Sequence, residues 1–402
     1  MEELSWGSII VRMFIQLGPV WIALIVLFAL SIVYKRKLGL YGKLFDSTIG
    51  MIGFALVMFW VFVGIFGGPL DMLITHDPLS QVSGMKNKIP GTPMRGAEEG
   101  EYAYFLLGGD NLARDVFSRL IKGAWVVVQI APIATLFAFM VGITLGLPAG
   151  FYGGRLDTVL SFLANLILAF PVILLFYLLV TPEIVLTGIP NYMAIFLFIF
   201  PLIFMTILLN SRYYTQPKIR TPLLVGVLVG MGWLYLSLIS TNGYAVPGKI
   251  IGLPEFLDLF DIDPGILVVF VSVVFVNSPT VFRIVRGLAM DIKTRDYVAA
   301  AQTRGEGPWY IMLWEILPNA RGPLIVDFCL RIGYTTILLG TLGFFGLGLE
   351  SESPDWGSTI NAGRRLLALY PHAAIAPAVA LLTLVLGLNL LADGLREESL
   401  RD

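Results

Sequence analysis

The sequence predicts an all-α membrane protein that crosses the bilayer about nine times, and two observations lead to this fold class. The first is composition, because 57% of the 402 residues are hydrophobic, 14% are charged and the mean hydropathy is +0.82. A soluble domain of this length could not bury so much apolar surface in its cores. The second is the recurrence of long apolar runs, since about 20 such residues are needed to cross a hydrocarbon core of about 30 Å.

Nine apolar runs reach this length, and each predicts one transmembrane helix. They cover residues 14–33, 49–67, 126–149, 158–180, 193–210, 222–241, 264–282, 322–343 and 372–391. We do not expect the first run to be a cleaved signal peptide, because its basic cluster Lys35–Lys37 follows the apolar stretch instead of preceding it.

The distribution of basic residues predicts the orientation of these spans. If Lys35–Lys37 lies in the cytoplasm, nine alternating spans place the loop Arg212–Arg220, the segment 283–321 and the C-terminal tail on the same side. The inside loops are then about twice as dense in Lys and Arg as the outside segments, as the positive-inside rule requires. We therefore expect the N-terminus outside and the C-terminus in the cytoplasm.

Two outside segments follow from this topology. Residues 68–122 are rich in Gly, Pro and charge, which is typical of a loop without a core of its own. Near their end, Asp110 could cap a helix with Val116 and Leu120 on one side, which predicts an amphipathic helix lying on the outer membrane face. The second segment, 350–370, carries Trp356, which we expect to anchor at the level of the lipid headgroups.

The longest polar stretch on the cytoplasmic side, Arg283–Arg321, has the Gly and Pro positions of a helical hairpin. The three alanines at 299–301 favour a helix, and Gly305 suits its left-handed end. Pro308 suits the first turn of a second helix, and Pro318 marks the return into the membrane. The small alanine side chains would also let the surface of a partner approach the backbone.

Four motifs in this order resemble bacterial ABC importer permeases. The sequence YVAAAQTRG at 297–305, followed by ILPNA at 316–320, is similar to the EAA loop of these proteins. The dipeptide and oligopeptide branch is suggested by GDNLARD at 109–115, FFGLGL at 344–349 with PDWG at 354–357, and DGLRE at 393–397. The resemblance covers roughly residues 41–181 and 264–402.

The resemblance implies a type I importer transmembrane domain with six core spans, and the second-permease, or "C", subunit of the importer. Residues 1–40 would then hold an extra N-terminal span, and residues 41–402 the permease domain. Within that domain we expect an inserted two-span hairpin at about 182–260 and an ATPase-coupling loop at 283–321. The residues that the resemblance assigns to this loop are Tyr297, Ala299, Ala300, Ala301, Gly305, Pro308, Ile316, Leu317 and Pro318.

The resemblance also implies the partners, cofactors, location and cargo of the protein. The expected partners are a second homologous permease that completes a heterodimer, two cytoplasmic ABC ATPases, an extracytoplasmic solute-binding protein and membrane lipid. ATP and Mg²⁺ would bind the ATPases, so this chain would bind no cofactor and would not itself be an enzyme. The expected place is the bacterial cytoplasmic membrane and the expected cargo a peptide, although nickel, glutathione and oligosaccharide importers can share these motifs.

The sequence departs from the family pattern at two positions. Ala299 stands where the EAA motif has its Glu, so a polar contact to the ATPase or within the loop is absent or replaced. Ala113 stands where a Gly is usual, which bears on the tightness of that outer turn.

Asp327 and Arg331 are the clearest ionisable residues inside the predicted spans. Their i, i+4 spacing puts them on one helix face, where charge is costly unless paired or hydrated. They could belong to the transport pathway, or they could form a buried ion pair within this chain or with a partner permease.

The sequence gives little support for a metal site, a catalytic site, a phosphate-binding loop or a nucleic-acid-binding surface. His76 and His372 have no second His, Cys or carboxylate at ligand spacing, which argues against a metal site or a Ser-His-Asp site. The phosphate-binding motif GxxxxGK[ST] is absent. A formal net charge of −1 gives no basic field for nucleic acid.

Two alternatives from other functional classes stay open. An ion-gradient-driven secondary transporter would hold both energy coupling and substrate site in its own spans, and Asp327 is the plausible proton carrier for it. A non-transporting membrane scaffold would use the three extra spans as its working part. Recovery of two ATPases and a second permease with this chain would separate the importer from both.

Overall fold

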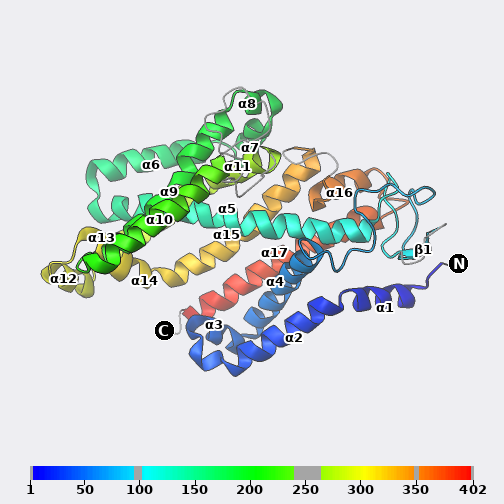
Figure 1. Ribbon diagram of the computed structural model, residues 1–402, viewed down its shortest axis with the longest axis horizontal. Helices are drawn as coiled ribbons and strands as arrows, with labels where there is room; N and C mark the ends of the chain where they lie inside the picture. The colour runs from blue at the N-terminus through cyan, green and yellow to red at the C-terminus, as the bar shows by residue number, and fades with distance from the viewer. Residues whose placement is uncertain (1–2, 95–101, 240–263, 348–352, 400–402) are drawn as a thin grey trace. The chain divides into compact units, whose positions relative to one another are not determined.

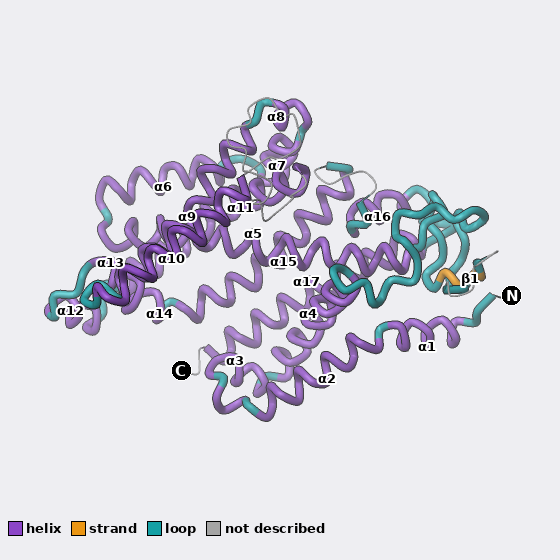
Figure 2. The backbone as a smooth tube through the Cα atoms, viewed as in Figure 1, coloured by secondary structure: helices purple, strands orange, loops and turns teal. Residues whose placement is uncertain are grey.

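The computed structural model describes residues 3–94, 102–239, 264–347 and 353–399, and most of its regular structure is helical (Figures 1 and 2). The earlier elements are α1 (Trp6–Gln16), α2 (Gly18–Val33), α3 (Gly39–Lys43), α4 (Thr48–Gly67), β1 (Thr92–Pro93), β2 (Tyr104–Phe105), α5 (Val116–Tyr152), α6 (Gly154–Leu168), α7 (Val172–Val180) and α8 (Pro182–Leu186). The later ones are α9 (Ile189–Arg212), α10 (Pro217–Ile239), α11 (Pro264–Ile292), α12 (Asp296–Thr303), α13 (Pro308–Tyr310), a π-helical turn (Ile311–Ile316), α14 (Leu317–Asn319), α15 (Arg321–Phe345), α16 (Trp356–Arg364) and α17 (His372–Ser399). Short 3₁₀ turns at Lys35–Lys37 and Leu44–Asp46 flank α3.

The expected spans are present as helices. Over the described residues, seven single helices are long and apolar enough to cross a membrane, and the number rises to nine if each of two bent pairs is one span. The pairs are α1 with α2, bent by 58°, and α6 with α7, bent by 81°. Pro171 lies at the second break, where its missing N–H and its ring end a helix.

The described chain divides into two compact units. Unit 1 comprises Met1–Pro132 and Cys329–Asp402, and unit 2 comprises Ile133–Phe328. These units do not correspond to the predicted extra spans and core spans, so that division stays a prediction. The last part of the predicted insertion at 182–260 lies outside the described residues, which end at 239 and resume at 264.

Helices α4 and α17 form the main helix pair of unit 1, and glycines let their backbones meet. A Cβ on Gly53 would lie 2.7 Å from the Leu390 carbonyl carbon and 2.8 Å from the Gly387 oxygen. Gly394 of α17 faces Gly50 of α4 in the same way. In a bilayer, where lipid tails are as apolar as leucine, such close backbone packing is a principal source of helix association.

We expect Gly53→Val to destabilise the protein by about 3 kcal/mol, because the added atoms overlap backbone that cannot rotate away. The measurement is the midpoint of unfolding of the purified protein in detergent. Gly226→Val is the matched control, since a Cβ at Gly226 of α10 would meet nothing within 4 Å. Equal midpoints for the two variants would show that the α4–α17 approach does not limit stability.

The N-terminal span packs on α4 through aromatic rings. Trp21 lies 5.2 Å from Phe59 between ring centroids, and Phe28 lies 5.6 Å from Phe54. The Ser31 and Tyr41 hydroxyls are hydrogen-bonded at 2.7 Å. The opposite side of α2 exposes large aliphatic side chains, as a lipid-facing helix would.

The expectation of an amphipathic helix on the outer membrane surface is wrong. Residues from Val116 onward begin the single 37-residue helix α5, and Val116 and Ile121 are buried inside unit 1. At about 1.5 Å per residue this helix is longer than a hydrocarbon core is thick, so it can continue beyond the membrane without a break. The segment before it also buries side chains, among them Leu73 and Phe105, so it is more than an open loop.

The polar turn before α5 is built around Asp110 and Ala113. Asp110 does not cap the helix: its carboxylate accepts from the Leu112 and Arg114 amides and from the Arg114 guanidinium at 2.7 Å. Ala113 adopts φ 64°, the left-handed conformation that a glycine takes without strain. The tight turn is therefore kept although Ala replaces the Gly of the motif.

Trp356 is a core residue of unit 1, so the expectation of a headgroup anchor is wrong. Its side chain is 1% exposed, its indole N–H donates to the Leu120 carbonyl at 2.8 Å, and its ring lies 5.1 Å from that of Trp60. The preceding Asp355 caps α16 by accepting from the Ser358 amide. Burial raises the pKa of the Asp355 carboxyl.

In unit 2, small residues of α5 lie against α11. A Cβ on Gly142 would lie 2.7 Å from Val281 Cβ, and one on Gly146 would lie 2.9 Å from the Phe282 oxygen. Gly150 continues this stripe one turn later, against Arg286. The spacing of four residues keeps the three glycines on one face, so the two helices can approach closely.

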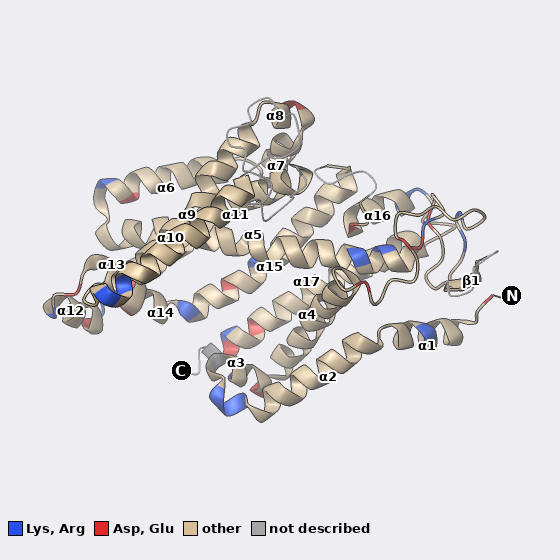
Figure 3. Cartoon of the chain, in the orientation of Figure 1, with Lys and Arg blue, Asp and Glu red and all other residues tan. Residues whose placement is uncertain are grey.

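The hairpin of α9 and α10 packs against the other helices of unit 2. Phe198 of α9 lies 5.3 Å from Phe137 of α5 and 5.4 Å from Phe270 of α11, between ring centroids. The Tyr235 hydroxyl of α10 donates to the Ile195 carbonyl of α9 at 2.9 Å. Figure 3 shows Lys and Arg gathered at the end of the hairpin where the two helices meet.

Candidate functional site

Residues 296–319 lie within the predicted coupling loop (283–321, called the coupling loop below) and fold as the predicted hairpin of two short helical arms. The first arm is α12, which ends before Gly305, whose φ is +78°. The second arm, residues 308–319, begins with Pro308 in its first turn and runs through α13, the π-helical turn and α14. The left-handed end at Gly305 and the helix start at Pro308 are confirmed.

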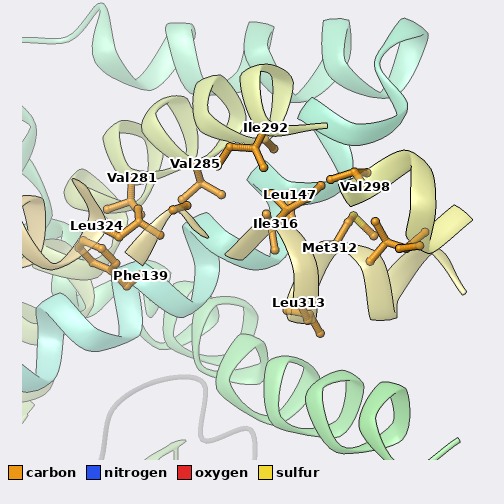
Figure 4. Packing of buried hydrophobic residues seen from close by; sticks show 14 residues of the cluster. Phe139, Leu147, Val281, Val285, Ile292, Val298, Met312, Leu313, Ile316 and Leu324 are labelled. Atoms are coloured by element: carbon orange, nitrogen blue, oxygen red, sulfur yellow. The ribbon is translucent and has the colours of Figure 1, made fainter. Parts of the chain in front are cut away.

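One face of the hairpin is anchored in a hydrophobic cluster of unit 2 (Figure 4). Val298 and Ala301 of the first arm and Met312 and Ile316 of the second are fully buried there, together with side chains of α5, α11 and α15. Val298 and Ala301 are three residues apart, as two neighbours on one helix face must be. Leu317 is half-buried against the same cluster.

The other face of the hairpin is exposed. Its exposed members from the predicted set are Tyr297, Ala299, Ala300, Gly305, Pro308 and Pro318. Ala301 and Ile316 are buried, so they hold the hairpin in place and are not available to a partner. Ala299, Ala300 and Gly305 give this face small side chains or none, and Gln302, Thr303 and Arg304 are exposed beside them. Partial burial raises the pKa of the Tyr297 hydroxyl.

An ion pair joins the two arms across their turn. Arg304 Nη2 lies 2.8 Å from Glu315 Oε1, and Asn319 donates from its side-chain amide to the Glu315 carbonyl at 2.6 Å. A polar contact within the loop is thus made by Arg304 and Glu315, while Ala299 carries no side-chain polar group. The pair is half-exposed, and such ion pairs contribute about 0.2–1 kcal/mol to the free energy of unfolding.

Charged side chains tie α11 to neighbouring helices near the coupling loop. Arg286 forms a two-pronged ion pair with Asp157 of α6, including an Nη2 to Oδ2 distance of 2.6 Å. Lys293 donates to the carbonyls of Gly150 and Phe151 at the end of α5, at 2.8 and 3.2 Å. Sequence reasoning missed the Asp157–Arg286 pair, although an Asp and an Arg at the edges of two apolar runs were a signal for it.

Asp327 and Arg331 lie one turn apart on α15, as predicted. Arg331 is buried and Asp327 is half-buried. Their role in a pathway or an ion pair stays a prediction.

His76 has a carboxylate partner that its position in the sequence did not reveal. Its Nδ1 lies 3.2 Å from Oδ2 of Asp115, and its Nε2 lies 2.7 Å from the Tyr102 carbonyl. Asp115 is fully buried and also accepts from the Ser118 and Thr75 hydroxyls at 2.6 and 2.7 Å.

The order of these contacts differs from that of a catalytic triad. Asp115 lies between Ser118 and His76, and the Ser118 hydroxyl donates to the carboxylate, whereas a triad needs the imidazole between the nucleophile and the acid. Asp115 also accepts from the Phe117 and Ser118 amides, so it caps α5. Within the described residues, no group of three or more His, Cys, Asp or Glu side chains could hold a metal ion.

Comparison with known proteins gives a family match and several relatives. Residues 142–397 match the family model described as "Binding-protein-dependent transport system inner membrane component". A di/tripeptide transport system permease protein from Pseudomonas aeruginosa is 26% identical over 91% of this chain and 93% of its own length. A glutathione transport system permease protein from Pectobacterium atrosepticum is 27% identical over 74% of this chain and 73% of its own. A dipeptide transport system permease protein from Haemophilus influenzae is 26% identical over 74% and 75%.

Proposed function

The chain belongs to the family of binding-protein-dependent transport system inner membrane components, and we propose that it forms one half of a membrane pathway through which such a system imports short peptides. The observation that carries this proposal is the hairpin of the coupling loop. One of its faces is fixed in a cluster with α5, α11 and α15, and the other is exposed and includes the small residues Ala299, Ala300 and Gly305. Such a hairpin can receive a force from outside the chain and pass it to membrane helices.

The mechanism follows from this attachment. Closure of a pair of ATPases on binding ATP would press on the exposed face at Ala299, Ala300 and Gly305. Because Val298 and Met312 are buried among side chains of α5 and α11, the hairpin cannot move without shifting those helices. Repeated closure and opening would alternate the access of the pathway between the two sides of the membrane.

The partners follow from the same proposal. A second, homologous permease completes the pathway as a heterodimer, two cytoplasmic ATPases bind ATP and Mg²⁺, and an external solute-binding protein delivers the cargo. This chain supplies the pathway and the docking surface and leaves ATP hydrolysis to the other subunits. Membrane lipid covers the exposed apolar faces of the spans.

The proposed orientation has the N-terminus outside and the C-terminus in the cytoplasm. Arg212 at the end of α9 lies beside Trp314 of the coupling loop, with its guanidinium carbon 4.6 Å from the ring centroid. The basic α9–α10 loop and the coupling loop therefore share one side of unit 2, which supports placing both in the cytoplasm, where basic loops accumulate.

The proposed cargo is a peptide of two or three residues. The relatives at 26 and 27% identity are named for dipeptide, di/tripeptide or glutathione transport, and all of these cargoes are short peptides. The substrate is fixed by side chains that line the pathway of both permeases, so this part of the proposal needs its own test.

The experiment is affinity purification of the tagged chain from native membranes in mild detergent, with mass spectrometry of what accompanies it. We expect two ATPases and a second permease. The recovered complex in liposomes should take up a labelled tripeptide only with ATP and the binding protein, and excess dipeptide, but not nickel or an oligosaccharide, should compete. Uptake driven by an ion gradient without any ATPase would contradict the proposal and favour a secondary transporter.

A further inference from the structure

The second arm of the coupling loop contains an uncommon helix geometry. Residues Ile311–Ile316 form a π-helical turn, which is wider than an α-helical turn and occurs mostly in single turns, frequently at functional sites. Ile311, Met312 and Leu313 are all buried although they follow one another in the chain. The second arm therefore contacts other parts of the protein on more than one side. On one side it contacts the hydrophobic cluster that also holds the first arm.

The hairpin of α9 and α10 is the neighbour on another side. The Trp314 indole N–H donates to Ser211 Oγ at 3.1 Å, and Arg212 lies over the Trp314 ring at 4.6 Å. Ser211 Oγ in turn donates to the Leu208 carbonyl at 2.9 Å. A hydroxyl suits this position because it accepts from Trp314 and donates to the backbone at the same time.

Apolar contacts extend this interface along α9. Phe204, Ile207 and Leu208 pack against the cluster that holds the coupling loop. Phe204 and Ile207 also line one narrow pocket together with Trp309 and Leu313 of the second arm. Over about two turns, the last part of α9 thus contacts the second arm through both polar and apolar groups.

The hairpin has a second attachment nearer the middle of α9. Phe198 packs between Phe137 of α5 and Phe270 of α11, and Pro201 lies inside the helix between this attachment and the contacts with the second arm. A proline removes one helical hydrogen bond and favours a bend at that place. The part of α9 after Pro201 can therefore respond to the coupling loop while the part before it stays fixed.

We propose that the α9–α10 hairpin is a built-in brace for the second arm, and that Ser211 and Arg212 are positioning residues for the coupling step. The inference rests on the proposed function of the coupling loop and gives the hairpin a role in it. When an ATPase presses on the exposed face, the brace limits sideways movement of the second arm, so that the displacement goes into α5 and α11. Loss of the brace leaves docking in place and lets ATP be hydrolysed without transport.

The test compares Arg212→Gln with Arg220→Gln in the assembled transporter in liposomes. Both variants remove one positive charge from the same loop, but Arg220 lies over Tyr214 and not over the coupling loop. The readout is the number of ATP molecules hydrolysed per peptide imported. The loss of a cation–π contact of ordinary strength corresponds to about a threefold effect. We therefore expect Arg212→Gln, but not Arg220→Gln, to hydrolyse about threefold more ATP per peptide imported.

Three further measurements separate positioning from simple damage to the fold. Arg212→Lys keeps the cation and should restore most of the coupling. In hydrogen exchange, the amides of residues 309–316 should exchange about threefold faster in Ser211→Ala than in the unchanged protein, while those of α12 keep their rate. Ser211→Ala and Trp314→Phe combined should be no worse than Trp314→Phe alone, because that variant already lacks the hydrogen bond to Ser211.

The outcomes distinguish this inference from the proposed function. Equal ATP-to-peptide ratios for Arg212→Gln and Arg220→Gln, together with unchanged exchange of residues 309–316 in Ser211→Ala, would overturn the brace alone if the complex still imports peptide with ATP. A chain that binds no ATPase and imports without ATP would overturn both.

Discussion

Gly305→Val is expected to reduce ATP-driven import more than tenfold while the protein still inserts and folds. Gly305 has φ +78°, and no atom lies within 4 Å of the place where a Cβ would go, so backbone strain is the sole direct cost. A left-handed conformation is costly for an ordinary residue and a true outlier for a β-branched one, with strain of about 1–3 kcal/mol. The chain relieves this strain by altering the turn between the two arms, which moves the docking face that the ATPase contacts.

Gly307→Val is the matched control for this change. Gly307 also has open space around its Cβ position, but its φ of −67° and ψ of 152° suit a β-branched residue. The measurement is ATP-dependent peptide uptake and ATPase activity of each complex in liposomes. If Gly305→Val imports peptide at the unchanged rate, the coupling loop does not have the docking role proposed for it.

Asp115→Ala is expected to lower the free energy of unfolding by about 3–5 kcal/mol, the largest stability effect that we predict. The Asp115 carboxylate is fully buried and accepts from the hydroxyls of Thr75 and Ser118 and from the amides of Phe117 and Ser118. Its removal leaves these donors without their acceptor in a place closed to water, takes away the cap of α5 and removes the carboxylate that lies 3.2 Å from His76 Nδ1.

Asp77→Ala is the control for the loss of a carboxylate from the same region. Asp77 is exposed and accepts from the Leu79 amide, so its replacement should lower the free energy of unfolding by less than about 1 kcal/mol. The measurement is the denaturation midpoint of each variant purified in detergent, with unfolding monitored by tryptophan fluorescence. Similar midpoints for the two variants would show that the Asp115 cluster does not stabilise this unit.

Local signals in the sequence were sufficient for the hairpin of residues 296–319. Gly305 predicted a left-handed helix end and Pro308 a helix start, because each reflects a restriction on the backbone of that residue alone. The apolar runs predicted the spans for a similar reason, since burial in hydrocarbon needs length and composition but no particular partner. The resemblance of the EAA-like motif then led to the family that the match over residues 142–397 shows.

Local signals were misleading where a side chain had a distant partner. Trp356 has the composition of a membrane-interface anchor, yet its indole N–H meets the Leu120 carbonyl, 236 positions away in the chain. His76 seemed to lack a partner because Asp115 is 39 positions further on. The start of α5 looked amphipathic, but its apolar side chains face protein and not the bilayer surface.

The sequence by itself determined that this protein spans the membrane, where along the chain the apolar helices lie, and which loop has the pattern of a coupling loop. These properties depend on hydropathy, on glycine and proline, and on charge, all of which act within a few residues of chain. The tertiary structure decided which loop residues face outward, that Asp157 pairs with Arg286, and that Ser211 and Arg212 hold Trp314. These contacts join residues about 100 or more positions apart, and helix packing selects them from many partners that local pattern cannot distinguish.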